Sequence, residues 1–271
     1  MDKRQARPRH YLMCEPTFFE VSYSINPWMN PSCPTSTERG LAQWMTLHDL
    51  LVGLEHAVEL IEPVAGLPDM VYSANGATVV DGRALVARFR HEERVKESPA
   101  YLDWFRARGW EARQAESINE GEGDFLCTGD VVLAGTGFRS EPKAHDEAAE
   151  YFGKPVLGLT LIDDRYYHLD TALAVLDDNE IMYHPEAFSP ESRMLLEERF
   201  PDAILADAHD AAVFGLNAVS DGLHVILAQQ AERLPCQLRE RGFEPIGVDM
   251  TELLKGGGGA KCCTMELREG D

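Results

Sequence analysis

The sequence has few basic residues for its length. Its 271 residues include 25 Lys and Arg against 46 Asp and Glu, which gives a formal net charge of -21 at pH 7. A field of this sign repels the phosphate backbone of nucleic acids and the head groups of anionic lipids. We therefore expect neither a nucleic-acid partner nor a membrane partner, and a small cation is the more natural ligand.

Long apolar runs and a secretory leader are missing as well. No stretch approaches the roughly 18 apolar residues of a membrane span, and no apolar segment follows the basic residues at 3–9. The six cysteines form no Cys-x-x-Cys pair and no small-domain disulfide framework. We expect a cytoplasmic protein with reduced thiols. The sequence does not decide the oligomeric state, and a homo-oligomer is compatible with it.

Evenly spaced hairpin signals run through the chain. Turn residues fall near positions 81, 129, 177 and 221, which are 48, 48 and 44 residues apart. Each turn separates two predicted strands, and a predicted helix and a third strand follow. Such a period is typical of a radial or stacked repeat. A strand after Cys262 and a strand at Tyr11 would supply a fifth unit and close the ring as in propellers.

This pattern predicts an α/β protein in which residues 1–271 form a single domain. The alternative is a plain α/β sandwich whose hairpins happen to be evenly spaced. Three further elements are predicted beside the repeated pattern. An apolar stripe predicts a helix over 35–59, and a strand over 70–80 enters the first turn. A last strand is predicted over 262–267.

Polar residues lie just before the predicted turns, where the first strand of each unit would line a central channel. They are Asn75, Glu120, Glu122, Asp124, His168, Asp170 and Asn217. On a strand, His168 and Asp170 would share one face, so that a carboxylate acts beside a histidine serving as general acid and base. His-x-Asp is also a metal-ligand spacing, which the absence of a second histidine pair disfavours. Residues 119–124 could equally be a solvated turn.

A run of four glycines precedes Cys262 near the C-terminus. Glycine is the most permissive backbone and lets a chain pass close to a ligand, so the run would present the thiol at the mouth of a loose loop. One alternative is an ordinary turn before a strand with a buried cysteine. Another is a phosphate cradle, which Ala260 before Lys261 and the acidic field disfavour.

Six ordered motifs carry a resemblance to a known family. They are Asn-Pro-Trp at 26–28, Ser-Ala-Asn at 73–75, Glu-Gly-Glu-Gly-Asp at 120–124, Gly-Phe-Arg-Ser at 137–140, Tyr-His-Leu-Asp-Thr at 167–171 and Gly-Gly-Gly-Ala-Lys-Cys at 257–262. Together they resemble the guanidine-modifying superfamily of arginine deiminases, dimethylarginine dimethylaminohydrolases and amidinotransferases. The greatest likeness is to the arginine dihydrolase domain of cyanobacterial enzymes, and it spans nearly the whole chain.

The resemblance implies a five-bladed α/β propeller of ββαβ repeats, the pentein fold, and a role for each matched residue. Cys262 would be the nucleophile and His168 the general acid and base, while Glu120 and Asp170 would grip the guanidinium. The implied substrate-binding residues are Asn26, Asn75, Arg94, Arg139 and Asn217. The motif around Glu120 leaves open whether Glu120 or Glu122 reaches the substrate, and the dihydrolase-like pattern favours Glu120.

The reaction that the resemblance implies is hydrolysis of the guanidino group of free L-arginine, with no metal and no cofactor. A thiouronium on Cys262 would be hydrolysed to citrulline. Where the deiminases have an aspartate, this chain has the neutral amide of Asn75, which could retain citrulline for a second attack that gives L-ornithine, CO2 and two ammonia. One alternative is a deiminase or dimethylargininase that stops at citrulline. From another class, a non-catalytic module could bind arginine without turning it over.

Overall fold

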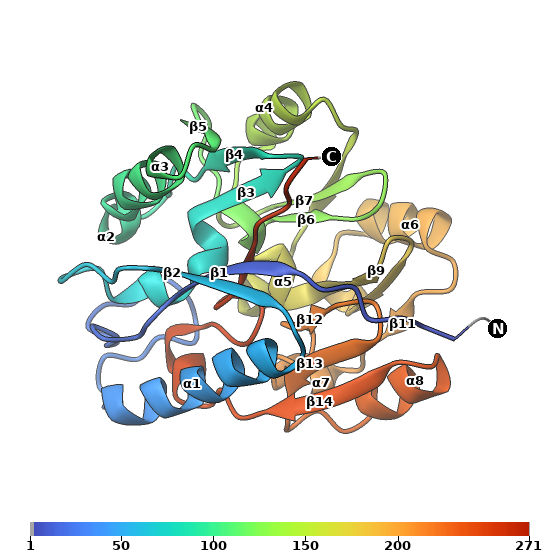
Figure 1. Ribbon diagram of the computed structural model, residues 1–271. Coiled ribbons are helices and arrows are strands. Elements are labelled where there is room, and N and C mark those ends of the chain that lie inside the picture. The colour runs from blue at the N-terminus through green and yellow to red at the C-terminus, as the bar shows by residue number, and fades with distance from the viewer. Residues whose placement is uncertain (1–2, 271) are drawn as a thin grey trace.

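In the computed structural model, which describes residues 3–270, the chain forms five three-stranded sheets. In each sheet the middle strand pairs antiparallel with one neighbour and parallel with the other. A parallel pair needs a crossover connection, and a helix supplies it in every unit. Figure 1 shows α1, α3, α4, α6 and α8 around the outside of the sheets. Five ββαβ units confirm the predicted five-bladed α/β propeller.

The elements follow the same order in each blade. The first two blades contain β3 (Ala77–Val80), β4 (Arg83–Val86), α2 (Glu92–Val95), α3 (Glu97–Ala107) and β5 (Glu111–Gln114), then β6 (Phe125–Cys127), β7 (Val132–Thr136), α4 (Pro142–Phe152) and β8 (Val156–Thr160). The next two contain α5 (Leu169–Ala172), β9 (Leu173–Asp177), β10 (Glu180–Tyr183), α6 (Pro190–Arg199) and β11 (Ile204–Leu205), then α7 (Ala208–Ala212), β12 (Val219–Ser220), β13 (His224–Ala228), α8 (Leu234–Glu240) and β14 (Glu244–Val248).

The fifth blade joins the two ends of the chain, as predicted. It contains β15 (Met265–Glu266), β1 (His10–Cys14), α1 (Thr37–Gly53) and β2 (Ala57–Ile61). Tyr11 pairs with Glu266 and Leu12 with Met265 in the antiparallel register of β1 and β15. In Figure 1 the C-terminal segment accordingly passes beside β1. The ring is therefore closed by backbone pairing between its first and last strands.

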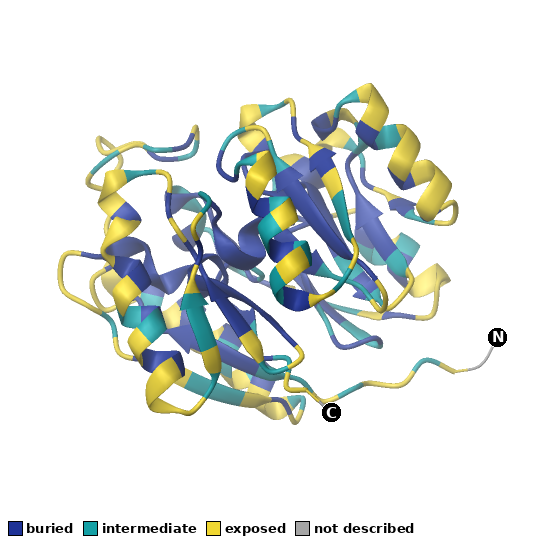
Figure 2. Ribbon diagram, turned by 90° about the horizontal axis from the view of Figure 1, so that it is seen from above, coloured by how far each residue is buried: buried dark blue, intermediate teal, exposed yellow. Residues whose placement is uncertain are grey.

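Burial follows the blade plan. The inner strands are apolar and dark in Figure 2, whereas the exposed residues gather on the peripheral helices and turns. All four residues of β3 are buried, and β3 contacts β15 while β9 contacts both β6 and β12. The residues just before these strands are thereby brought toward a common centre. In the part of the chain that the structure describes, no helix is both long and apolar enough to cross a bilayer.

The hairpin turns confirm the predicted period, and the first one shows why the signal was readable. Asp81 and Gly82 have φ angles of 47° and 78°. Two successive positive φ angles define the type I′ turn that suits the twist of a two-residue hairpin, and Asp-Gly is among its preferred sequences.

The predicted helix over 35–59 was wrong at its C-terminal end. The helix α1 ends at Gly53, and Glu55 takes a left-handed φ of 66°. The chain then continues as β2, which pairs in parallel with β1. The apolar residues that continued the helical stripe here serve a strand, because short apolar runs fit either period.

Two predicted strands are shorter than expected. Residues 68–76 form the 3-10 turns η1 (Pro68–Val71) and η2 (Ser73–Gly76) before β3 begins. At the other end, Cys262 lies in a turn and only Met265–Glu266 is a strand. The first strand of a blade is thus short, and a tight turn precedes it.

The basic N-terminal segment is part of the fold. Arg4 and Arg7 make ion pairs with Asp177, Asp178 and Glu180 at the hairpin of the third blade. The Arg7 amide also donates to Asp221 O in the fourth blade, at 2.9 Å. These contacts fasten the segment that leads into β1 to the third and fourth blades.

A buried carboxylate fixes the last helix of the fourth blade. The Asp210 side chain accepts hydrogen bonds from the backbone N–H groups of Glu232, Arg233 and Leu234, at 2.8, 2.9 and 2.6 Å. By contrast, Asp207 caps α7 by accepting from the Asp210 amide at 2.9 Å, and it makes an exposed ion pair with Arg233 at 3.3 Å.

Asp210→Ala should therefore lower the free energy of unfolding by about 3 kcal/mol or more, because it leaves three buried backbone N–H groups without an acceptor. Asp207→Ala, the matched control, removes one helix cap and should cost about 1 kcal/mol. Urea denaturation of the two variants provides the measurement. Equal losses would contradict the anchoring role of Asp210.

Candidate active site

The predicted site residues converge at the start of the inner strands. Asn75 lies on η2, and Glu120 immediately precedes η3 (Gly121–Gly123). Among the other predicted residues, His168 and Asp170 lie at α5, and Cys262 lies in the turn before β15. All of these side chains are buried. The expectation that they lie on channel-facing strands was wrong in detail, because each is on the turn that leads into a strand.

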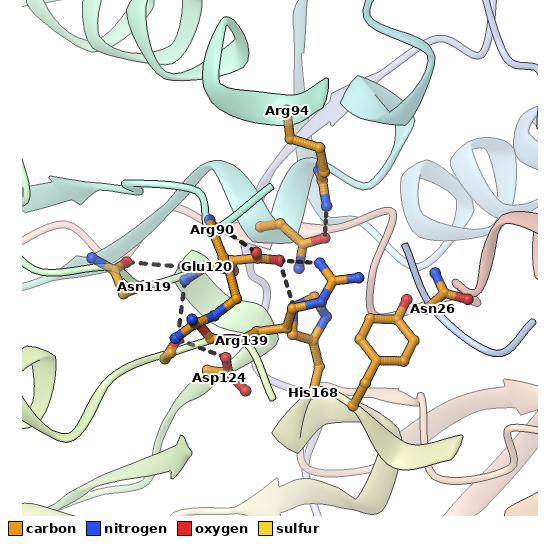
Figure 3. Close-up of polar contacts among 12 residues, drawn as sticks. Asn26, Arg90, Arg94, Asn119, Glu120, Asp124, Arg139 and His168 are labelled. Carbon is orange, nitrogen blue, oxygen red and sulfur yellow. Dashed lines mark hydrogen bonds and ion pairs between the residues drawn. The ribbon is translucent and has the colours of Figure 1, made fainter. Parts of the chain in front are cut away.

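The centre of the cluster is the carboxylate of Glu120 (Figure 3). Its Oε2 accepts from Arg139 Nη1 at 2.7 Å and lies 2.8 Å from His168 Nε2. Its Oε1 receives only a long contact of 3.4 Å from the Arg90 amide. Burial alone would raise the pKa of Glu120, but the Arg139 guanidinium and His168 hold it well below its usual range. Glu120 is therefore an anion with one oxygen atom largely free.

Asp124 helps to hold the backbone around this carboxylate in place. Ser140 Oγ donates to Asp124 Oδ2 at 2.6 Å and accepts from the Glu120 amide at 3.1 Å. Asp124 Oδ1 accepts from the Leu169 amide, at 3.1 Å, next to His168. Burial raises the pKa of Asp124 to about 6. Asp124 thus holds the Leu169 amide directly and the Glu120 amide through Ser140, a role that the sequence did not reveal for Asp124 or Ser140.

Asn217 organises the thiol of Cys262. Its Nδ2 lies 3.1 Å from Cys262 Sγ, and its Oδ1 accepts from the amides of Cys262 and Gly259, both at 3.1 Å. The same Nδ2 donates to Asp170 O at 3.1 Å. Asn217 therefore fixes the nucleophile candidate and the glycine-rich loop together.

The thiol faces a carboxylate in this structure. Cys262 Sγ donates to Asp170 Oδ2 at 3.2 Å, while Asp170 Oδ1 has no partner within residues 3–270. Burial and the neighbouring Asp170 charge raise the pKa of Cys262 well above its usual range. Burial also raises the pKa of Asp170, to about 7. Burial and the Asp170 charge both favour the protonated form of the Cys262 thiol.

His168 and Asp170 do not share a face, contrary to expectation. His168 precedes α5 and turns to Glu120, whereas Asp170 lies within the helix and turns to Cys262. A spacing of two residues puts side chains on one face of a strand but on different sides of a helical turn. The carboxylate beside the histidine is Glu120, which comes from another blade.

The structure separates Glu122 from Glu120. Glu122 makes ion pairs with Lys261, at 2.7 Å, and with Arg268, and it accepts from the Glu266 amide at 3.0 Å. All three partners belong to the C-terminal segment. Of the two glutamates, only Glu120 contacts His168.

Arg94 is held by buried acids. It forms a bidentate pair with Glu97, at 2.8 and 2.9 Å, and Nη1 donates to Asn75 Oδ1 at 2.8 Å. Burial raises the pKa of Glu97 to about 7 and also raises that of Asp69, 3.9 Å from Arg94. Neither acid was predicted, because their positions in the sequence carry no motif.

Asn75 and His168 are neighbours across Gly123. A Cβ on Gly123 would lie 3.1 Å from His168 Nδ1 and would collide with Asn75 Nδ2. Neither nitrogen has a hydrogen-bond partner among the described residues. Because an arginine can only donate, the Arg94 contact identifies Oδ1 of Asn75 as the acceptor and leaves its N–H group free.

The glycine-rich loop is packed, not loose. All four glycines from Gly256 to Gly259 are buried. A Cβ at any of them would collide with a neighbouring side chain, and the side chains in question are those of Tyr72, Asn26, Tyr167 and Asn217. Asn26 Nδ2 donates to Gly256 O at 3.1 Å, and its Oδ1 accepts from the Trp28 amide at 2.9 Å. Asn26 therefore ties the segment 15–36 to this loop.

Residues 3–270 hold no group of three or more His, Cys, Asp or Glu side chains arranged to bind a metal ion.

The relatives of this chain among known proteins are enzymes. No family model matches the chain. It is 52% identical over 265 residues to an N(G),N(G)-dimethylarginine dimethylaminohydrolase of Mycobacterium tuberculosis, an alignment that covers 98% of this chain and 88% of the relative. It is 38% identical over 267 residues to AgrE of Nostoc sp., a bifunctional arginine dihydrolase/ornithine cyclodeaminase, covering 96% of this chain and 38% of that protein.

A solved structure agrees with these relatives. The N-terminal domain of ArgZ, a bifunctional arginine dihydrolase/ornithine cyclodeaminase of Synechocystis sp., has been solved covalently bound to a reaction intermediate. It superposes with a TM-score of 0.92 at 36% identity, over 96% of this chain and 98% of that one.

Replacing Asp170 by Asn should make Cys262 more nucleophilic in the empty site. The substitution removes the negative charge that opposes ionisation of the thiol, so the Cys262 pKa falls. At about pH 8, alkylation by iodoacetamide should accelerate about three- to fourfold for each pKa unit lost, because the larger thiolate fraction outweighs the lower intrinsic nucleophilicity of the thiolate. Peptide-resolved mass spectrometry gives the rate at Cys262, and the exposed Cys236 is the internal control. A slower reaction at Cys262 in the variant would show that Asp170 favours the thiolate instead.

Proposed function

This chain belongs to the family of the dimethylarginine dimethylaminohydrolases and arginine dihydrolases, hydrolases of guanidino C–N bonds, and we propose from that premise that it converts free L-arginine to L-ornithine, CO2 and two ammonia. The observation that carries this proposal is the free N–H group of the neutral Asn75 amide beside His168. The catalytic groups are Cys262, His168, Glu120 and Asp170.

Two carboxylates with free oxygens suit a guanidinium. Glu120 Oε1 has only the long contact with Arg90, and Asp170 Oδ1 is without a partner in the described chain. A guanidinium is planar, cationic and only a donor. Bound between these oxygens, it is held with its carbon beside Cys262. The positive charge of the guanidinium offsets the negative charge of Asp170, so the pKa of the Cys262 thiol falls when substrate binds.

The first half of the reaction releases one ammonia. The Cys262 thiolate attacks the guanidinium carbon, and the tetrahedral adduct expels ammonia as His168 supplies a proton. Glu120 orients the imidazole through its contact with Nε2, whereas Nδ1, on the other side of the ring, stays free. Water activated by His168 then attacks the S-alkylthiouronium, the C–S bond breaks, and citrulline forms. No group outside this chain, arginine and water takes part.

The second half depends on retaining citrulline. The ureido group differs from a guanidinium in carrying a carbonyl oxygen, which needs a donor. Asn75 offers a free N–H, whereas an aspartate would offer only acceptors. With the ureido oxygen held there, Cys262 attacks again and ornithine leaves. Water cleaves the carbamoyl thioester to carbamate, which gives CO2 and the second ammonia. Two waters are consumed for each arginine.

Recognition of the α-amino-acid end is assigned to Arg94 and Arg139. An arginine fork pairs bidentately with a carboxylate. In the structure Arg139 donates to Glu120 and, at 2.9 Å, to Ile25 O, and the Arg94 fork is bonded to Glu97. The assignment therefore requires both arginines to exchange a carboxylate partner for the substrate carboxylate. Asn26 and Asn217 act on the loop and the thiol that they contact.

A second candidate is hydrolysis of a methylated arginine that stops at citrulline. The 52% identity to a dimethylarginine dimethylaminohydrolase favours it. The first half of the mechanism is unchanged, with dimethylamine leaving in place of ammonia. Retention of citrulline is what separates the two candidates.

Product analysis tests the proposal. Wild-type protein given L-arginine should yield ornithine with two equivalents of ammonia, and Cys262→Ala should yield neither. Asn75→Asp should shift the ratio of citrulline to ornithine upward about tenfold, which corresponds to loss of one hydrogen bond of about 1.4 kcal/mol. Stoichiometric citrulline from the wild type would reject the dihydrolase, dimethylamine from asymmetric dimethylarginine would support the second candidate, and binding without turnover would reject both.

A methyl group on Gly123 should separate Asn75 from His168. The variant Gly123→Ala should lower kcat/KM for arginine about 100-fold, because a displacement of about 1 Å in a catalytic group has an effect of that size. Gly53→Ala is the control, since a Cβ there has no atom within 4 Å. Both variants should keep the wild-type far-UV circular dichroism. Full activity in Gly123→Ala would contradict the proposed pairing of Asn75 with His168.

A further inference from the structure

A second cavity lies at the other end of the central channel. The candidate active site is at the beginning of the inner strands, and this cavity of about 260 Å³ is at their ends. All five inner strands line it, through Val80, Leu126, Leu176, Ser220 and Glu266. None of the catalytic residues assigned above contributes to its walls.

A chain of ion pairs runs along one wall. Arg9 binds Glu266 at 3.2 Å, Glu266 binds Arg268 at 2.8 Å, and Arg268 and Lys261 both bind Glu122, the latter at 2.7 Å. Three cations therefore share two carboxylates. The wall has one positive charge in excess, which an anionic group in the cavity would balance.

Two donors on the same wall lack acceptors. The Tyr11 hydroxyl and Arg9 Nε have no hydrogen-bond partner among residues 3–270, although both atoms are buried. Tyr11 is only 2% exposed, and both residues line the cavity. A buried donor without an acceptor is costly, so these groups are suited to a carboxylate that enters the cavity.

The mouth of the cavity is lined mainly by carboxylates. Its charged lining consists of Asp81, Asp177, Asp178 and Lys154. Lys154 pairs with Asp81 at 2.9 Å, and Arg7 pairs with the other two aspartates from outside the cavity. Arg4 also lies 3.6 Å from Asp177. Three carboxylates thus face three cations, and the mouth presents carboxylate oxygens next to aliphatic walls.

We propose that this cavity binds a free aliphatic amino acid, with its carboxylate toward Arg9, Tyr11 and Arg268, and its ammonium toward the aspartates of the mouth. A positive wall, carboxylate oxygens at the mouth and an apolar lining match a small zwitterion better than either ion alone. This site does not depend on the proposed reaction.

Lys261 connects the cavity to the thiol. It lines the cavity and pairs with Glu122, and its neighbour in the chain is Cys262. It also donates to Thr264 O at 2.9 Å, within the turn that carries Cys262. A carboxylate in the cavity competes for Lys261 and Arg268, and so alters this turn. Occupancy should therefore change the rate of arginine turnover.

Calorimetric titration with L-valine tests the site. Isovalerate and isobutylamine, which each retain one charge of valine, are the comparison probes and should bind at least about tenfold more weakly, a difference of ~1.4 kcal/mol. In Tyr11→Phe, valine should bind about 3- to 10-fold more weakly, the effect of one hydrogen bond. The thermal midpoint should not fall, because the hydroxyl has no partner to lose.

Tyr151→Phe is the matched control, since its hydroxyl contacts Glu111 O, at 3.2 Å, away from the cavity. It should bind valine as the wild type does. Failure of valine to bind at millimolar concentration, equal binding of a single-charge probe, or unchanged affinity in Tyr11→Phe would each overturn the site. Valine binding that leaves the turnover of saturating arginine unchanged would overturn the connection through Lys261.

Discussion

The buried carboxylate of Glu120 is the interaction on which the rest of the site depends. A lone carboxylate in this interior would take up a proton, and the Arg139 guanidinium and His168 prevent it. Each partner comes from a different part of the chain, and Asp124 and Ser140 fix the backbone on both sides. The propeller provides what this arrangement needs, because it brings the starts of five strands to one centre.

The fold could be predicted because its signals are local. Two residues such as Asp81-Gly82 are enough to predict a hairpin turn, and the repetition of such turns predicted the number of blades. The end of α1 could not be placed, since the run after Gly53 fits a helix or a strand until its pairing with β1 is known. The paired termini were predictable only from the count of blades, not from any feature of β1 or β15 themselves.

The site residues also differ in how far the sequence could predict them. Cys262, His168 and Glu120 stand in recognisable motifs, and the structure brings the last two into contact. Glu97, which holds Arg94, stands in no motif. Ser140 ends the motif at 137–140, but nothing in that motif indicates that its hydroxyl bonds to Asp124. His168 and Asp170 were misassigned to one strand face because a short helix, α5, replaces the strand there. Contacts between residues far apart in the chain decide such details, and a single sequence does not record them.

Closure of the ring by β1 and β15 makes the order of synthesis matter. Cys262 lies just before the closing strand, and Tyr11 meets Glu266 only when nearly the whole chain exists. Contacts of such long sequence separation form late, because the loop they close is costly in entropy. A nascent chain can thus pair the strands of four blades and bring Glu120 to His168 while Cys262 is still missing. The full set of candidate site residues is assembled in a single late event of folding.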